Sequence, residues 1–320
     1  MQSTYPVSST ERDSWILSRR PERNIVDPFQ PYAFLVEDER AASGEIVPVA
    51  TVFLTNRECP WRCLMCDLWR NTLAETVPIG AIPAQIDYAL ERLSPARQIK
   101  LYNSGSFFDP RAIRLEDHPA IANRVKGFER VIVECHPALV GDACLRFRDQ
   151  LTGKLEVAMG LETAHPEILE RLNKRMTVEQ FESAAHLLAK NDIDLRVFIL
   201  VKPPFMKEEE ALEWAARSLD FAFECGATVA TLIPTRSGNG AMDELAAVGQ
   251  FSSPSLTTLE AAIEYGIGLN KGRVFADLWD VRTASQCPSC YDLRIERLHA
   301  MNLQQSILSQ IICERCGGKS

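Results

Sequence analysis

Short apolar runs alternate with helical stretches along most of this chain, and this alternation restricts the fold more than any other feature. The helical stretches include 83–93, 177–191, 207–225 and 255–269. Strands that alternate with helices form β-α units and a parallel sheet. The sequence therefore predicts an α/β fold, a partial (β/α)6 barrel of the TIM type. The runs that predict its strands are 47–54, 98–102, 130–134, 156–161, 194–201, 228–233 and 273–278.

Two stretches of different composition flank the predicted barrel. Residues 1–45 are polar and rich in Arg, Glu and Pro, which indicates an extension that packs on the main domain or forms a mobile arm. Residues 46–280 contain the barrel, and residues 281–320 form a small C-terminal segment with two pairs of cysteines. We therefore expect one large domain with two appendages.

The composition fits a globular enzyme, with 320 residues of which 46% are hydrophobic and 24% charged. A net charge of −8 argues against a self-sufficient nucleic-acid binder, although it allows a local basic groove. Ten cysteines without an export signal predict metal or redox chemistry in a reducing cytoplasm. No apolar run approaches the ~20 residues needed to cross a bilayer, so we expect no membrane partner.

Three cysteines directly follow the first predicted strand. Cys59, Cys63 and Cys66 have the spacing Cys-x3-Cys-x2-Cys. Three thiolates on one short loop can hold three irons of a [4Fe–4S] cluster and leave the fourth iron open to a small molecule. A structural zinc loop is the alternative, but zinc usually takes four ligands and no histidine stands nearby. The spacing therefore favours a cluster with one open iron.

Four sequence blocks stand in the order that is typical of the radical S-adenosylmethionine (radical SAM) superfamily. The chain resembles this superfamily, in particular the archaeosine-biosynthesis radical enzymes and the radical domain of the elongator catalytic subunit. The resemblance implies that the cluster on the three cysteines binds S-adenosylmethionine (SAM) and cleaves it reductively. The product is a 5′-deoxyadenosyl radical that abstracts a hydrogen from substrate. The four blocks are the cysteine loop, 102–109, 160–164 with 172–174, and 200–205.

The resemblance implies SAM contacts at the carboxyl ends of the strands. Ser104 and Gly105 lie in a turn where the backbone can approach the methionine ammonium. Glu134 can pair with that ammonium or with a ribose hydroxyl. Glu162 corresponds to a residue that touches the nucleoside, and Lys174 to a basic residue near the methionine carboxylate. For each of the five, a turn or surface role is the plainer alternative.

Three further side chains lie near this predicted site. Lys202 stands at an apolar strand exit, where its ammonium either binds an anionic substrate group or reaches solvent. Trp61 and Trp69 flank the cysteine loop and are expected to pack against the adenine or the cluster.

Two Cys-x2-Cys pairs occur near the end of the chain, separated by a spacer, 291–312, that is expected to be largely helical. Two such pairs can wrap one metal ion tetrahedrally, and zinc is the usual ion. A second [4Fe–4S] cluster or a metal-free pair of turns are the alternatives. The pairs are Cys287 with Cys290 and Cys313 with Cys316, whereas the remaining cysteines, Cys135, Cys144 and Cys225, are expected to be buried thiols.

Together, the cysteine loop and the resemblance predict a radical SAM enzyme. The resemblance suggests a lyase or modification step on a 7-deazapurine-type nucleoside or on tRNA. A small metabolite or natural-product intermediate is the alternative substrate, and a non-catalytic zinc-binding partner protein is the alternative of another class. The expected partners are a reductant such as ferredoxin or flavodoxin and tRNA or a tRNA-modifying protein.

Overall fold

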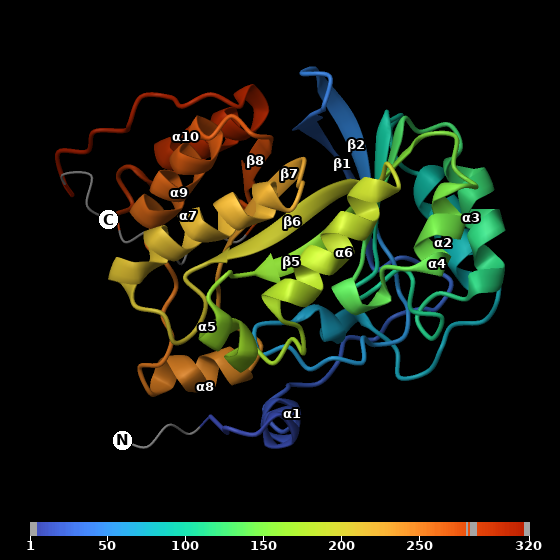
Figure 1. Cartoon of the computed structure of the whole chain (residues 1–320), viewed down its shortest axis with the longest axis horizontal. Coiled ribbons are helices and arrows are strands. Elements are labelled where there is room, and N and C mark those ends of the chain that lie inside the picture. Colours follow the sequence, from blue (N-terminus) through green and yellow to red (C-terminus); the bar gives the residue numbers. More distant parts are fainter. Residues whose placement is uncertain (1–4, 280, 282–286, 317–320) are drawn as a thin grey trace.

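The computed structural model describes residues 5–279, 281 and 287–316. Its eight strands form one sheet in which spatial order follows chain order, and the sheet curls into a half-barrel (Figure 1). β1 (Ala33–Arg40) is antiparallel to β2 (Ile46–Phe53), and all later neighbours are parallel. The predicted fold class is confirmed. The later strands are β3 (Gln98–Tyr102), β4 (Arg130–Glu134), β5 (Lys154–Glu162), β6 (Asp194–Val201), β7 (Val229–Pro234) and β8 (Arg273–Ala276).

Helices cover the convex face of this sheet (Figure 1). Three of them, α6, α7 and α9, pack against the central strands, while α10 contacts both edge strands, β1 and β8. None of the described helices is both long and apolar enough to span a bilayer. The helices are α1 (Ser9–Leu17), α2 (Ala81–Leu90), α3 (His118–Val125), α4 (Asp142–Arg148), α5 (Pro166–Arg171), α6 (Val178–Lys190), α7 (Glu208–Glu224), α8 (Ala241–Ala247), α9 (Leu256–Gly268) and α10 (Tyr291–Gln304).

Alternation along the parallel strands separates an apolar core from a polar lumen. Side chains such as Val131, Val157 and Val197 face the helices and are fully buried. The alternate positions face the concave side, where Arg196 lies 2.6 Å from Glu156. Both of these side chains are buried, so each charge depends on a partner within the lumen.

Strand β1 was not predicted, because residues 37–40 read Glu-Asp-Glu-Arg and lack an apolar alternation. In the structure Glu39 is only 7% exposed and lies 2.6 Å from Lys100 and 2.5 Å from Arg196. These partners come from β3 and β6, so distant segments stabilise the strand. The N-terminal stretch is thus packed on the barrel and contributes one edge of its sheet.

Candidate active site

The three cysteines of the first motif lie on the loop that follows β2, at the carboxyl edge of the sheet. All three are free and partly exposed. The residue before Cys59 is Glu58, whose carboxylate lies 2.6 Å from Arg20 and 3.1 Å from Arg62 and also pairs with Arg23. Since Arg20 and Arg23 belong to the N-terminal segment (residues 5–23), this segment is tied to the cysteine loop.

The turn after α5 supports the cysteine loop from one side. The backbone N–H of Leu64 donates to the carbonyl of Leu172 over 2.9 Å. The side-chain amide of Asn173 donates to the carbonyl of Arg62 over 2.8 Å and to Asp13 over 2.7 Å. The loop therefore has a fixed backbone that does not depend on a ligand.

Two further side chains bind carbonyls of the same loop. Asn239, which follows β7, donates to the carbonyls of Leu64 (2.8 Å) and Cys66 (3.1 Å). The indole N–H of Trp69 also donates to the carbonyl of Cys66, over 3.1 Å. Trp69 is buried, and its packing against the adenine or the cluster stays a prediction. Asn239 was not predicted, because no local pattern links it to a loop so distant in sequence.

The three thiols are protonated until a metal displaces the proton. Burial raises the pKa of Cys59, Cys63 and Cys66 to about 12, since it disfavours the thiolate. The ammonium of Lys174 acts in the opposite direction on Cys59 and Cys63. A metal cluster that binds here must therefore release protons, and Lys174 offsets part of the negative charge.

Glu134 holds the turn that follows β3. Its carboxylate accepts from the backbone N–H groups of Asn103 (2.8 Å) and Ser104 (3.1 Å). Burial raises the pKa of Glu134 to about 7, although these hydrogen bonds oppose the shift. The two predicted site residues Glu134 and Ser104 are thus in direct contact, and the turn is fixed by the neighbouring strand.

Gly105 brings this turn against the cysteine loop. A methyl group at this position would lie 3.3 Å from Cβ of Cys59, tighter than ordinary contact. The close approach of the two loops therefore favours glycine, because a larger residue would need a shift of a few tenths of an ångström.

Glu162 and Lys174 form a buried ion pair. The carboxylate and the ammonium are 2.5 Å apart, and both side chains are about 10% exposed. A β-bulge between Gly160 and Glu162 turns the Glu162 side chain at the end of β5. The ion pair needs the space that Gly160 leaves, because a Cβ there would lie 2.1 Å from Oε1 of Glu162 and 2.4 Å from Nζ of Lys174.

The loop after β4 contacts both the cysteine loop and the turn after α5 that contains Lys174. The rings of Trp61 and His136 stack with centroids 3.7 Å apart and planes 10° apart. The Nε2 atom of His136 lies 3.0 Å from the carbonyl of Lys174. Burial lowers the pKa of His136 to about 4, so its ring is neutral near pH 7. Trp61 thus packs on protein in this structure, and an adenine contact stays a prediction.

Strained backbone marks the carboxyl ends of three strands. Ser104, Glu162 and Lys202 have φ values of 54°, 66° and 54°, in the left-handed region that non-glycine residues rarely adopt. Such conformations cost roughly 1–3 kcal/mol each and cluster at functional sites. The ends of β3, β5 and β6 therefore carry a strain that only the surrounding contacts offset.

Comparison with known proteins identifies this arrangement. The family model described as "Radical SAM superfamily" matches residues 53–215, half of the chain. The chain belongs to the radical SAM superfamily. The expected relationship is confirmed, and the chain is an enzyme of this superfamily. The alternative of a non-catalytic zinc-binding partner is therefore set aside.

Three similar proteins refine the relationship. An uncharacterized protein of Methanocaldococcus jannaschii is 25% identical over 308 residues, 91% of this chain and 84% of its own length. The archaeosine synthase subunit beta of Methanosarcina acetivorans is 28% identical over 232 residues, and the match covers 68% of this chain and 66% of the subunit. The archaeal Elp3 of Methanocaldococcus infernus superposes with a TM-score of 0.51 at 14% identity, covering 73% of this chain and 60% of Elp3, which shows a common fold.

The radical SAM cofactors fit the side chains at this edge. Three free thiols on a fixed loop match the donor set of a [4Fe–4S] cluster with one open iron. Beside them, both polar atoms of the Asn103 side chain are buried with no partner among the described residues. A buried amide without hydrogen bonds is costly, so Asn103 is a candidate ligand contact that the sequence analysis did not single out.

Lys202 has partners within the protein. Its ammonium lies 2.7 Å from Glu208 and 2.6 Å from the hydroxyl of Ser252, and the side chain is buried. The predicted need for a partner is confirmed and the alternative that the ammonium reaches solvent is wrong, whereas a contact with an anionic substrate group stays a prediction. Lys202 therefore ties β6 to the start of α7 and to the segment before α9.

The four cysteines near the end of the chain, Cys287, Cys290, Cys313 and Cys316, lie together as a second group of thiols, separate from the cysteine loop after β2. Their four sulfur atoms all lie within 4.8 Å of one another. Of the spacer, 291–304 is helical as α10, whereas 305–312 is extended or irregular. The other three cysteines, Cys135, Cys144 and Cys225, are buried thiols as predicted.

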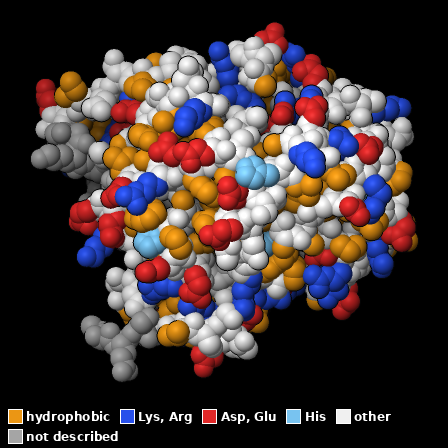
Figure 2. Space-filling view, in the orientation of Figure 1, with side chains coloured by type: hydrophobic (Ala, Val, Ile, Leu, Met, Phe, Trp, Pro, Cys, Tyr) orange, Lys and Arg blue, Asp and Glu red, His pale blue; other side chains and the backbone are white. Residues whose placement is uncertain are grey.

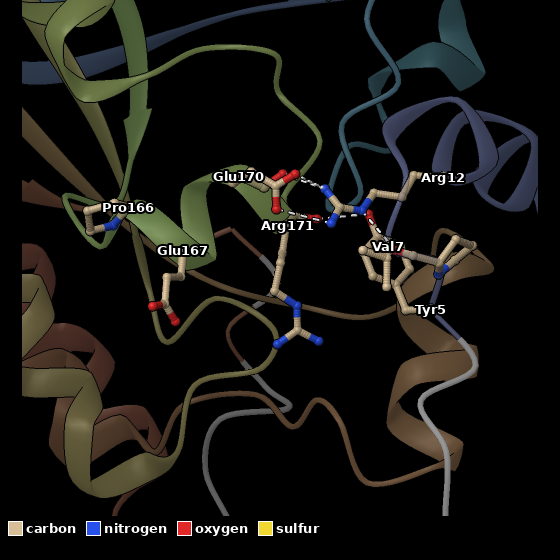
Figure 3. Close-up of a pocket in the computed structure, with 8 residues that line it drawn as sticks. Tyr5, Val7, Arg12, Pro166, Glu167, Glu170 and Arg171 are labelled. Carbon is tan, nitrogen blue, oxygen red and sulfur yellow. Dashed lines mark hydrogen bonds and ion pairs between the residues drawn. The ribbon is translucent and has the colours of Figure 1, made fainter.

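A cavity of about 580 Å³ lies between the N-terminal segment and α5 (Figure 3). Arg12 of α1 pairs with Glu170 over 2.6 Å, and the hydroxyl of Tyr5 donates to the carbonyl of Arg171 over 2.8 Å. None of the predicted SAM-contacting residues lines this cavity. The cavity results from the packing of the N-terminal segment on α5, next to the candidate active site.

Proposed function

We propose that this radical SAM enzyme binds a [4Fe–4S] cluster through Cys59, Cys63 and Cys66 and acts on a modified nucleoside of the 7-deazapurine type. The observation that carries the cofactor part is the fixed loop with three free thiols, against which Gly105 packs. When bound on these three cysteines, the cluster would supply the electron for the reductive cleavage of SAM. The substrate part rests on the similarity to archaeosine synthase subunit beta.

The chain's own residues have three tasks in this proposal. Glu134 holds the Ser104–Gly105 turn so that its backbone can face the methionine ammonium. The Glu162–Lys174 pair presents one carboxylate and one ammonium at the end of β5, beside the thiols. Asn103 supplies a free amide next to them. These groups orient SAM, and the half-barrel keeps solvent from the reactive carbon.

The charge of the chain's surface favours binding to a partner protein over direct binding to a nucleic acid. Acidic and basic side chains are interspersed over the face seen in Figure 2, and the net charge of the chain is −8. A nucleic acid would need a continuous basic surface. Two of the relatives are named archaeosine synthase subunit beta, so we infer that a second subunit supplies the contacts to tRNA.

The proposed chemistry needs reduced thiols and a low-potential electron donor. We therefore place the enzyme in the cytoplasm, with a ferredoxin or flavodoxin as the donor. A small metabolite is the alternative substrate, and the experiment is designed to separate the two.

The test has two stages under anaerobic conditions. In the first, protein with a reconstituted cluster, SAM and dithionite should form 5′-deoxyadenosine, and the Cys63→Ala variant should not. In the second, tRNA that carries a 7-deazaguanine-type base is compared with a protein-free small-molecule extract. Stimulation of 5′-deoxyadenosine formation by the tRNA, with a mass change in its base, supports the substrate proposal. Stimulation by the extract alone favours the metabolite, and no cleavage in the first stage contradicts the proposal as a whole.

A further inference from the structure

The four late cysteines have the geometry of a site for a single metal ion. Sγ of Cys287 lies 3.9 Å from Sγ of Cys313, and Sγ of Cys290 lies 3.7 Å from Sγ of Cys316. Zinc–sulfur bonds of about 2.3 Å in a tetrahedron place the sulfurs about 3.8 Å apart. We propose that these four cysteines bind one zinc ion, which fixes the C-terminal segment (residues 305–316) on α10.

The same distances argue against the two alternatives. In a [4Fe–4S] cluster each cysteine binds a different iron, so the four sulfurs stand further apart than around one shared ion. A disulfide requires a sulfur–sulfur distance of about 2.0 Å, and no disulfide joins any two of these four cysteines in the described part of the chain. Three of the four cysteines are buried, and Cys316 is partly exposed.

A side chain of α10 holds part of the C-terminal segment beside this helix. The guanidinium of Arg297, in the middle of α10, donates to the carbonyls of Leu308 (2.6 Å) and Ser309 (2.9 Å). Arg297 is 5% exposed and also lies 2.5 Å from Glu264 of α9. The C-terminal segment therefore runs back along α10 toward the amino end of this helix. There Cys313 lies beside the first cysteine pair, Cys287 and Cys290.

Positively charged groups lie near the four sulfurs, which suits a metal site whose net charge is negative. Four thiolates and one divalent ion sum to −2. Cys290 is the N-cap of the 14-residue helix α10, whose amino end carries a partial positive charge. Arg294, one turn further along this helix, pairs with Glu260 over 2.6 Å, whereas Arg315 donates to Ser289 over 3.2 Å. The helix end and Arg315 therefore offset part of the negative charge of the occupied site.

A closed set of four cysteines leaves no coordination position for a substrate, so the zinc serves structure. The ion joins both ends of a loop that contains α10, and α10 in turn contacts β1 and β8. Loss of zinc should therefore free the C-terminal segment while the cysteine loop after β2 keeps its contacts.

The experiment separates the two metal sites by mutation. A full-length variant with Cys59, Cys63 and Cys66 all changed to Ala should contain about one zinc per chain and no iron. Adding Cys313→Ser and Cys316→Ser should remove the zinc and make residues 305–316 sensitive to protease. The matched control adds Cys225→Ser, a buried thiol outside both sites, and should keep the zinc. X-ray absorption of the wild-type protein at the zinc edge should show four sulfurs at about 2.3 Å.

Three results would overturn the proposal. Roughly four irons in the triple variant would identify an auxiliary cluster. About one iron in place of zinc would change the identity of the ion. No metal in the triple variant, together with no zinc–sulfur signal in the wild-type protein, would leave the pairs as reduced thiols. The wild-type spectrum keeps the proposal testable even if a variant fails to fold.

Discussion

The carboxylate of Glu162 and the ammonium of Lys174 meet 2.5 Å apart in a space that exists only because residue 160 is glycine. The two residues are twelve positions apart, and the family resemblance implies separate roles for them at the nucleoside and at the methionine carboxylate. The structure joins them into one unit next to Cys59 and Cys63. Both charges are buried, so removing either one would leave the other buried and without its partner.

Gly160→Ala should separate this ion pair without unfolding the protein, because the displaced atoms are the ends of flexible side chains. We expect SAM binding to weaken by roughly tenfold, the equivalent of one lost hydrogen bond to a charged group. Anaerobic titration with SAM measures the effect. Gly127→Ala, where the new methyl group meets nothing within 4 Å, is the control. Equal affinity in both variants would show that the ion pair does not position SAM.

Glu162→Gln keeps the shape of the side chain and removes its charge. We expect the cluster to stay and SAM affinity to fall by about ten- to a hundredfold, since a charge-assisted hydrogen bond contributes about 1.5–3 kcal/mol. The double variant with Lys174→Met tests whether the two residues act as a unit, because their effects should then be less than additive. Unchanged affinity in the single variant would return Glu162 to a purely structural role.

Cys63→Ala should abolish the cluster and SAM cleavage while the fold stays intact. The backbone of the loop is held by Asn173 and Asn239, which do not depend on the thiol. Iron and sulfide counting after anaerobic reconstitution measures the loss, and Cys225→Ala is the control. A variant that still holds four irons and cleaves SAM would contradict the assignment of the ligands.

We expect the free energy of unfolding to depend on pH through the carboxyl group of Glu134. Its pKa is about 7 in the folded protein and 4.5 without the fold, so the folded state holds a proton that the unfolded state releases between these values. The resulting stabilisation is complete below about pH 4.5 and is lost as the pH rises through 7. We expect the free energy of unfolding of the apoprotein, relative to Glu134→Gln, to fall by about 2 kcal/mol between pH 5 and 8. Denaturation at both pH values measures it, and parallel curves for the two proteins would contradict it.

Glu58→Ala removes the partner of three arginines, two of them in the N-terminal segment. Because Arg20 is only 8% exposed, we expect a loss of about 3–5 kcal/mol, as for a broken buried ion pair, and faster loss of iron in air. Glu213→Ala, which breaks an exposed pair with Arg217, should cost at most about 1 kcal/mol. Similar losses in the two variants would mean that the N-terminal segment does not stabilise the cysteine loop.

The sequence predicted the parallel strands well because each is a local apolar run. β3, β4 and β6 have the predicted bounds. β1 was missed because the burial of Glu39 depends on Lys100 and Arg196, which no local pattern reveals. Likewise, the cysteine spacing identified the ligand loop, whereas the supports from Asn173 and Asn239 come from distant turns. The strained φ values at Ser104 and Glu162 have no signature in residue type.

The order of the strands has a consequence for how the chain is synthesised. Because spatial order follows chain order, each strand pairs with the one that left the ribosome just before it. The half-barrel can therefore grow by one β-α unit at a time, with no unpaired strand waiting for a distant partner. Only the contact between the two edges has to wait, since α10 follows all eight strands in the sequence and reaches back to β1. The nascent chain would thus hold a nearly complete barrel, with its cysteine loop already formed, before α10 packs against β1 and β8.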